Sequence, residues 1–66
     1  MTDELYEYYR TSTEAEVEMA EAYQSQGRRA KAQEALQQAR FWFMKCKFED
    51  LSPLQNRITK LENTLY

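Results

Sequence analysis

Cys46 is the only nucleophilic thiol of the chain. The sequence has no histidine, so the side chain that most often acts as a general base is missing. A reactive thiolate needs a neighbouring base or cation, and a zinc site needs several Cys or His ligands. Gly27 is the only glycine, which excludes a glycine-rich phosphate loop. We therefore predict a protein that is not an enzyme, with no catalytic residue, metal or cofactor, in which Cys46 is a partly buried structural thiol.

Three glutamates could supply paired carboxylates, because Glu14, Glu18 and Glu21 recur at helical spacing. Paired carboxylates perform acid–base chemistry when their environments move their pKa values apart. Nothing in the flanking sequence predicts a cleft or burial for these side chains. We expect a solvated acidic face.

Positive charge gathers directly after Gly27, at Arg28, Arg29 and Lys31. This is the predicted start of a helix, where the helix dipole disfavours cations. The presence of three cations at this position therefore needs an explanation. It could neutralise an acidic neighbour, or contact a phosphate group or an acidic partner. Further bases at positions 40, 45 and 47, together with aromatic rings, leave a nucleic-acid surface as an alternative. The net charge of −2 argues against a general nucleic-acid binder.

Phe41, Trp42 and Phe43 form the most suggestive motif. Successive helical residues lie about 100° apart, so three in a row span about 200° and at least one must face outward or toward another chain. Trp and Tyr dominate binding hot spots, which favours an interface anchor. A plug in the core beneath a third helix is the alternative. The predicted partner interface consists of Tyr6, Tyr8, Tyr9, Phe41, Trp42 and Lys45. We expect the aromatic triplet to meet the N-terminal tyrosines at the end of the hairpin opposite the turn.

Charge is distributed unevenly along the chain. Residues 1–26 carry seven acidic side chains against Arg10, whereas residues 27–48 carry six basic side chains against Glu34. Such halves attract each other when they fold side by side, and they can also face two different charged partners. The sequence leaves both interpretations open.

The elements that must position these residues are predicted to be helices, because helix formers dominate and the chain has one Gly and one Pro. The first helix covers about residues 3–26 and ends where Gly27 suits a left-handed conformation. The Ser/Thr-containing stretch 10–13 favours a continuous or gently kinked helix, with a restart near residue 12 as the alternative. The second covers about residues 28–49. Ser52 as N-cap and Pro53 at the first helical position predict a third helix over about residues 53–65.

Apolar stripes indicate how these helices pack. In the first helix a stripe of mostly small side chains runs through Ala15, Met19, Ala22 and Tyr23. In the third helix, apolar residues recur at positions 54, 58, 61 and 65, which fits either closure of the chain's own core or a short coiled-coil seam for a second copy. The predicted core consists of Leu5, Tyr9, Met19, Tyr23, Ala32, Leu36, Ala39, Phe43, Leu54, Ile58, Leu61 and Leu65.

The sequence thus predicts an all-α fold over a single domain, residues 1–66: an antiparallel helical hairpin plus a short third helix, forming a small helical bundle. A chain of this length buries only about 60% of the surface that it exposes when unfolded. Cys46 has no intrachain disulfide partner, so we expect self-association, most simply as a dimer. The lone thiol and the lack of a signal-like segment predict a cytoplasmic protein, and no apolar run approaches a membrane span.

Residues from Thr13 to about Met44, roughly half of the chain, resemble a single tetratricopeptide-type helix-turn-helix. In that family, small and large side chains at fixed positions mediate packing between two antiparallel helices. The resemblance implies an antiparallel hairpin, and it carries over no ligand-binding residue. The residues that match are Met19, Ala20, Tyr23, Gly27, Ala32, Leu36 and Ala39.

These features predict a small non-enzymatic protein–protein interaction module that acts through an aromatic helical surface. An adaptor, an inhibitor or an accessory regulator of bacterial or phage type has this size. One alternative is a nucleic-acid-binding regulator that uses the basic second helix. Another is a self-assembling structural subunit whose partner is itself.

Overall fold

The computed structural model describes residues 2–46 and 52–66. It contains helix α1 (Thr2–Ser25), helix α2 (Arg29–Phe43) and helix α3 (Ser52–Leu65). No strand occurs in these two ranges, so the predicted all-α class is confirmed. The stretch 10–13 lies inside α1, as expected for a continuous first helix.

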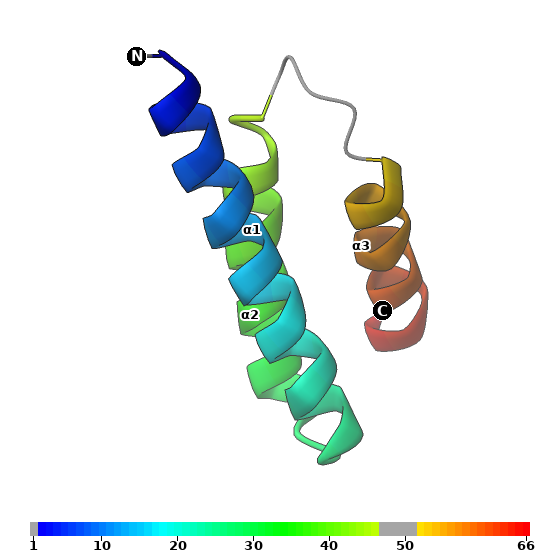
Figure 1. Cartoon of the computed structure of the whole chain (residues 1–66). Helices are drawn as coiled ribbons and strands as arrows, with labels where there is room; N and C mark the ends of the chain where they lie inside the picture. Colours follow the sequence, from blue (N-terminus) through cyan, green and yellow to red (C-terminus); the bar gives the residue numbers. More distant parts are fainter. Residues whose placement is uncertain (1, 47–51) are drawn as a thin grey trace.

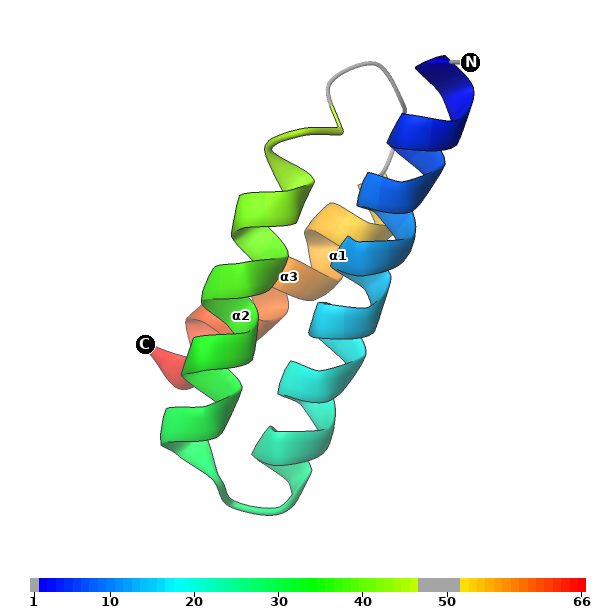
Figure 2. The same ribbon diagram turned by 90° about the vertical axis from the view of Figure 1, so that its left-hand side faces the viewer.

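Helices α1 and α2 form an antiparallel hairpin, and α3 lies obliquely across one of its faces (Figures 1 and 2). The molecule measures 40 × 16 × 14 Å along its principal axes. The N-terminal end of α1 and the C-terminal end of α2 meet at the end of the hairpin that is opposite the turn. This arrangement leaves that end with fewer helical neighbours than the middle of the hairpin.

The hairpin turns at Gly27, as predicted, with a positive φ of 75°. The Arg28 amide donates to the Tyr23 carbonyl at 2.8 Å, and the Gly27 amide donates to the Gln24 carbonyl at 3.0 Å. These two bonds define a Schellman motif, which satisfies carbonyls that the helix end would otherwise leave unpaired. Glycine is favoured here because a side chain at positive φ is strained.

The face that α1 buries differs from the predicted one. Thr13, Val17 and Ala20 are fully buried, whereas Met19 is 44% exposed and Leu5 is 51% exposed. The reason is that α1 contacts both α2 and α3. The face of α1 that becomes buried is therefore the one directed between these two helices. Thr13 tolerates burial because its hydroxyl donates to the Tyr9 carbonyl at 2.8 Å, which satisfies the polar group within its own helix.

The α2 side of the seam consists largely of small side chains, as predicted. Ala32, Leu36 and Ala39 are fully buried and Ala35 nearly so. Alanines let two helices approach closely, while Leu36 fills the centre of the core. Tyr23 and Phe43, two further members of the predicted core, are partly buried against it.

Helix α2 ends at Phe43, earlier than the predicted residue 49. The Lys45 amide donates to the Trp42 carbonyl at 3.0 Å, and the Cys46 amide donates to the Phe43 carbonyl at 3.0 Å. These i→i−3 bonds tighten the last turn and stop the α-helical pattern. The remainder of the predicted second helix, residues 47–49, lies outside the described ranges.

Helix α3 closes the core of its own chain. Leu54, Ile58, Leu61 and Leu65 are all at least 94% buried within one molecule, which excludes the coiled-coil alternative for this stripe. Its final carbonyl, that of Leu65, accepts from Arg29 Nη2 at 2.7 Å and from Gln33 Nε2 at 2.8 Å. Side chains of α2 therefore cap the end of α3 and fix where it crosses the hairpin.

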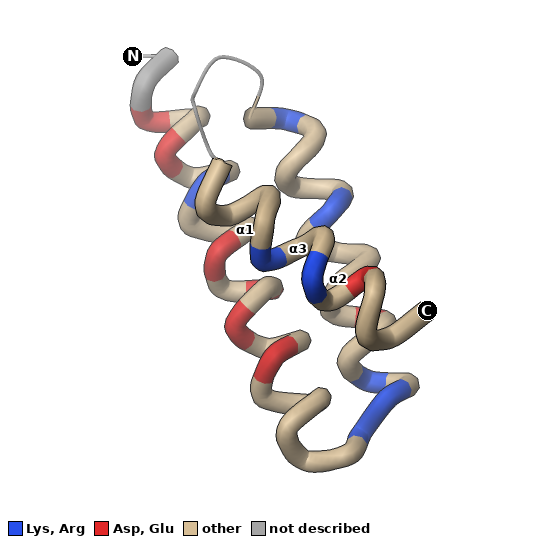
Figure 3. Tube along the Cα trace, turned by 90° about the vertical axis from the view of Figure 1, so that its right-hand side faces the viewer, with Lys and Arg blue, Asp and Glu red and all other residues tan. Residues whose placement is uncertain are grey.

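The ion pairs that join α3 to the hairpin differ from the predicted attraction between the two chain halves. Arg57 of α3 binds the Glu21 carboxylate of α1 through two nitrogen atoms. Its Nη2 donates to Oε1 at 2.5 Å and its Nε donates to Oε2 at 3.1 Å. Arg40 of α2 lies 3.3 Å from Glu62 of α3. Neither pair joins the acids of residues 1–26 to the bases of residues 27–48. Figure 3 shows acidic positions along α1 and basic positions on α3 where the two cross.

Acidification is expected to weaken the fold through the Glu21–Arg57 pair. The hydrogen bond from Arg57 lowers the pKa of the Glu21 carboxyl below its ordinary value of 4.5. The unfolded chain therefore takes up this proton more readily, so the contribution of the pair is complete above about pH 4.5 and is lost as the pH falls through the folded-state pKa. Thermal unfolding followed by circular dichroism should show a fall in Tm from about pH 5 to about pH 3 that is smaller in Glu21→Gln. An equal fall in both proteins would contradict a role for this pair.

Candidate functional site

The structure brings the six predicted interface residues together at the open end of the hairpin, and we call this group the aromatic end. Trp42 lies at its centre, between two tyrosines of α1. Its ring centroid is 5.6 Å from that of Tyr8 in an edge-on arrangement and 6.0 Å from that of Tyr9 in a stacked one. These are favoured geometries for aromatic pairs. The members are Tyr6, Tyr8, Tyr9, Phe41, Trp42 and Lys45.

Lys45 completes the aromatic end with a cation. Its ammonium nitrogen lies 4.9 Å from the ring centroid of Phe41 and 5.7 Å from that of Tyr9. Both distances are within the range of a cation–π interaction. The rings attract the ammonium group through their quadrupoles, but they do not neutralise its net charge.

The three consecutive aromatic residues of α2 point in different directions, as their 100° spacing requires. Phe43 packs against the core and borders α3 near Ile58. Trp42 turns toward the tyrosines of α1 and is half-buried. Phe41 is 51% exposed and contacts Trp42 at a centroid distance of 5.3 Å. The core interpretation therefore applies to Phe43, which is partly buried against the core, and the interface interpretation of Phe41 and Trp42 stays a prediction.

Large apolar side chains remain in contact with solvent around the aromatic end. Tyr8 is 53% exposed and Met44 is 73% exposed. A pocket of about 380 Å³ opens between Tyr9, Phe41, Met44 and Lys45. Met44 was not among the predicted interface residues, although its place three residues after Phe41 would have put it on the same helix face.

The structure does not bring Arg28, Arg29 and Lys31 together as an anion site. The Arg29 guanidinium is occupied by the Leu65 carbonyl, at 3.1 Å through Nε and 2.7 Å through Nη2. Lys31 lies 3.8 Å from Glu34 on the exposed surface of α2, and Arg28 is exposed before the helix begins. The cluster is thus explained largely by capping of α3 and by a local ion pair.

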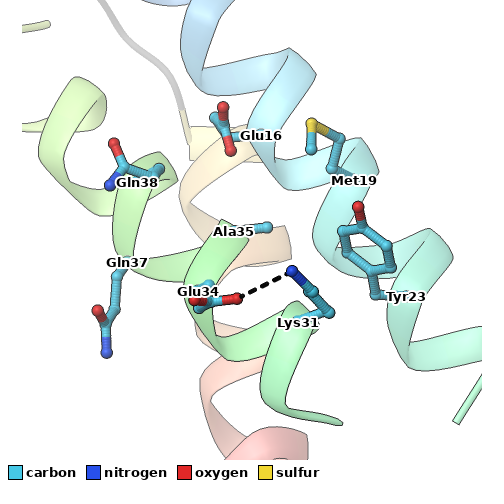
Figure 4. Close-up of a pocket in the computed structure, with 8 residues that line it drawn as sticks. All are labelled: Glu16, Met19, Tyr23, Lys31, Glu34, Ala35, Gln37 and Gln38. Atoms are coloured by element: carbon cyan, nitrogen blue, oxygen red, sulfur yellow. Dashed lines mark ion pairs between the residues drawn. The ribbon is translucent and has the colours of Figure 1, made fainter. Parts of the chain in front are cut away.

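A second hollow lies along the seam of α1 and α2, on the side of the hairpin away from α3 (Figure 4). It measures about 340 Å³, and the Lys31–Glu34 ion pair forms one of its borders. Met19 and Tyr23 line its α1 side. Met19 thus faces this hollow and is not part of the core. The remaining lining is mostly amide and carboxylate groups, and the charged side chains around the hollow are of both signs.

Cys46 is buried, and its thiol lies 3.7 Å from the Trp42 carbonyl as a weak hydrogen-bond donor. The expectation of a structural thiol agrees with this placement. Over residues 2–46 and 52–66, no group of three or more Cys, His, Asp or Glu side chains is placed to hold a metal ion. Within the same ranges, no helix combines the length and apolar character that crossing a bilayer requires.

The chain matches no family model, and no curated protein and no solved structure is significantly similar to it. The resemblance to a tetratricopeptide-type hairpin therefore stays a prediction. The observed hairpin agrees with the antiparallel packing that this resemblance implies.

Proposed function

We propose that this protein is a small non-enzymatic interaction module that binds another protein through its aromatic end. The observation that carries the proposal is the combination of order and exposure at this site. Trp42 holds Tyr8, Tyr9 and Phe41 in place by ring contacts, yet Tyr8 and Phe41 each keep about half of their surface open to solvent.

Such an arrangement suits binding for an energetic reason. Ordering flexible side chains on association costs free energy, and rings that already pack against one another avoid part of that cost. Large aromatic side chains also supply much of the binding energy in protein interfaces. Elsewhere in residues 2–46 and 52–66, exposed large apolar residues such as Met19 and Tyr66 do not belong to an aromatic cluster of this kind.

The same observations favour a protein partner over a nucleic acid. A nucleic-acid surface needs several free cations along one face. Two of the bases proposed for such a surface are engaged within the chain, Arg29 by a backbone carbonyl and Arg40 by Glu62. Acidic residues on α1 also lie near the aromatic end, where they would repel phosphate groups.

The proposal predicts that removing the exposed rings abolishes partner capture without unfolding the protein. We expect the double variant Tyr8→Ser, Phe41→Ser to lose at least about tenfold in binding, since each residue is an exposed aromatic anchor. The measurement is quantitative capture of a co-purifying protein by the immobilised chain from extracts of its native cell. Circular dichroism of the same variants reports whether the helices remain formed.

The matched control is Tyr66→Ser, which removes a ring that is 64% exposed and lies at the C-terminus of α3. It should capture the same protein as the unmodified chain does. Equal capture by the double variant would contradict the proposal. Capture of nucleic acid that weakens steeply with added salt would favour the alternative of a nucleic-acid-binding regulator.

A further inference from the structure

We infer that the partner of the aromatic end is a second copy of this chain, docked so that Lys45 of each copy meets Glu7 of the other. This inference rests on the proposed function and names the partner. It follows from two complementary surfaces that the structure places side by side at one end of the molecule.

The first surface is a pocket with a positive rim. Tyr9, Phe41 and Met44 supply apolar walls, and the Lys45 ammonium group lies over two of the rings. Lys45 forms no ion pair with another described residue. The occupant that satisfies this pocket therefore presents an apolar side chain beside a carboxylate.

The second surface is a ridge on the first turns of α1 with that composition. Leu5 and Tyr8 are each about half exposed, and Glu4 and Glu7 flank them. Residues 4, 7 and 8 share one helix face at the i, i+3, i+4 spacing, with residue 5 at its edge. Neither glutamate forms an ion pair with another described residue, so both carboxylates are available to a partner.

Both surfaces lie at the same end of the hairpin, because the N-terminal turns of α1 are beside the C-terminal turns of α2 (Figure 1). In a twofold dimer, residue i of one copy contacts residue j of the other, and the reverse contact forms by symmetry. The ridge of each copy can therefore enter the pocket of the other. Two equivalent contacts form at once, so the ridge and the pocket of both copies are occupied and this contact closes at the dimer.

The available area predicts a weak dimer. Leu5, Tyr8, Phe41 and Met44 are exposed by 51%, 53%, 51% and 73%. At about 200 Å² for a large side chain, they offer together roughly 450 Å² on each copy, little more than half of what a standard stable interface contributes. We therefore expect a dissociation constant in the micromolar range, so that monomer and dimer exchange at ordinary concentrations.

The test reverses the charges of Lys45 and Glu7, singly and together. The dissociation constant of the dimer is measured by sedimentation equilibrium from about 1 to about 500 µM. Lys45→Glu places like charges at both contacts, and so does Glu7→Lys. Each single variant should weaken the dimer at least about tenfold. The double variant K45E/E7K restores opposite charges across the interface and should return to within about threefold of the unmodified protein.

Lys31→Glu is the matched control, because it lowers the net charge by the same two units as K45E but lies near the turn end of the hairpin. It should leave the dimer intact. Circular dichroism confirms helicity in every variant. Failure of the double variant to restore the dimer, or an equal loss in Lys31→Glu, would overturn the docking.

A chain that stays monomeric over the whole range overturns the second copy as the partner. If that monomer still captures another protein in a manner that depends on Tyr8 and Phe41, the proposed function stands and its partner is a different chain. If it captures none, both proposals fall.

Discussion

Replacing Leu36 by alanine is expected to destabilise the protein by about 2–5 kcal/mol, which is comparable to the entire stability of a chain of this size. Leu36 is fully buried and is the largest fully buried side chain of the molecule's described residues. It belongs to a core cluster that all three helices share, so its truncation leaves a cavity among side chains that are already packed. The variant should be largely unfolded at room temperature or melt far below the unmodified protein.

Chemical denaturation followed by circular dichroism measures this loss. Leu5→Ala is the matched control, since the same atoms are removed from a side chain that is 51% exposed. We expect it to change the free energy of unfolding by at most about 0.5 kcal/mol. The Leu5 variant also tests which face of α1 is buried, because the sequence alone predicts Leu5 in the core. Similar losses in the two variants would contradict the observed packing.

Replacing Trp42 by alanine is expected to lower partner binding by about 2 kcal/mol or more, roughly thirtyfold, while the helical hairpin persists. Trp42 contacts three other rings, and each ring pair contributes about 0.5–1.5 kcal/mol beyond the area that it buries. Without it, Tyr8 and Phe41 lose their common support and must be ordered by the partner. Self-association and capture of a different protein are measured separately, by sedimentation and by immobilised bait.

Two further substitutions, one at position 42 and one at position 43, test whether the effect is specific to the Trp42 ring. Trp42→Phe keeps an aromatic ring between the tyrosines and should retain most of the binding. Phe43→Ala removes an aromatic ring from the next position, but that ring packs against the core and borders α3. It should lower the free energy of unfolding and leave binding by the folded fraction unchanged. Loss of binding in Phe43→Ala to the same extent as in Trp42→Ala would place the site elsewhere.

Local signals in the sequence were sufficient for the turn at Gly27 and for the third helix. Gly27 ends the first helix because the closing residue needs positive φ, and this requirement is independent of the rest of the fold. Ser52 and Pro53 begin α3 within one residue of the predicted start. The apolar residues of α3 repeat so regularly that only one face could be buried. These features depend on neighbours a few residues away, which a sequence displays directly.

The same reasoning was wrong for the buried face of α1. Val17 stands between two glutamates and Thr13 is polar, so neither predicts a core position on its own. Both are fully buried because α1 faces two helices at once and because the Thr13 hydroxyl is satisfied by its own helix. The direction from which α3 approaches decides this face, and that direction depends on Arg57, Arg29 and Gln33, which lie more than 30 residues from their hydrogen-bonding partners.

Some features of the candidate site follow from the sequence, and others depend on the tertiary structure. The sequence by itself determined that three consecutive aromatic residues on one helix could not all be buried, since helical geometry separates them by about 100° each. It also determined that the chain lacks the histidine and the cysteine pairs of common catalytic and metal sites. The predicted hairpin already placed the aromatic triplet against the N-terminal tyrosines. Only the tertiary structure decided that Trp42 is the ring between Tyr8 and Tyr9, that Arg29 caps α3, and that Lys45 lies over two rings. The reason is physical: the type and spacing of residues fix the local backbone, whereas contacts between distant side chains depend on where all three helices come to rest.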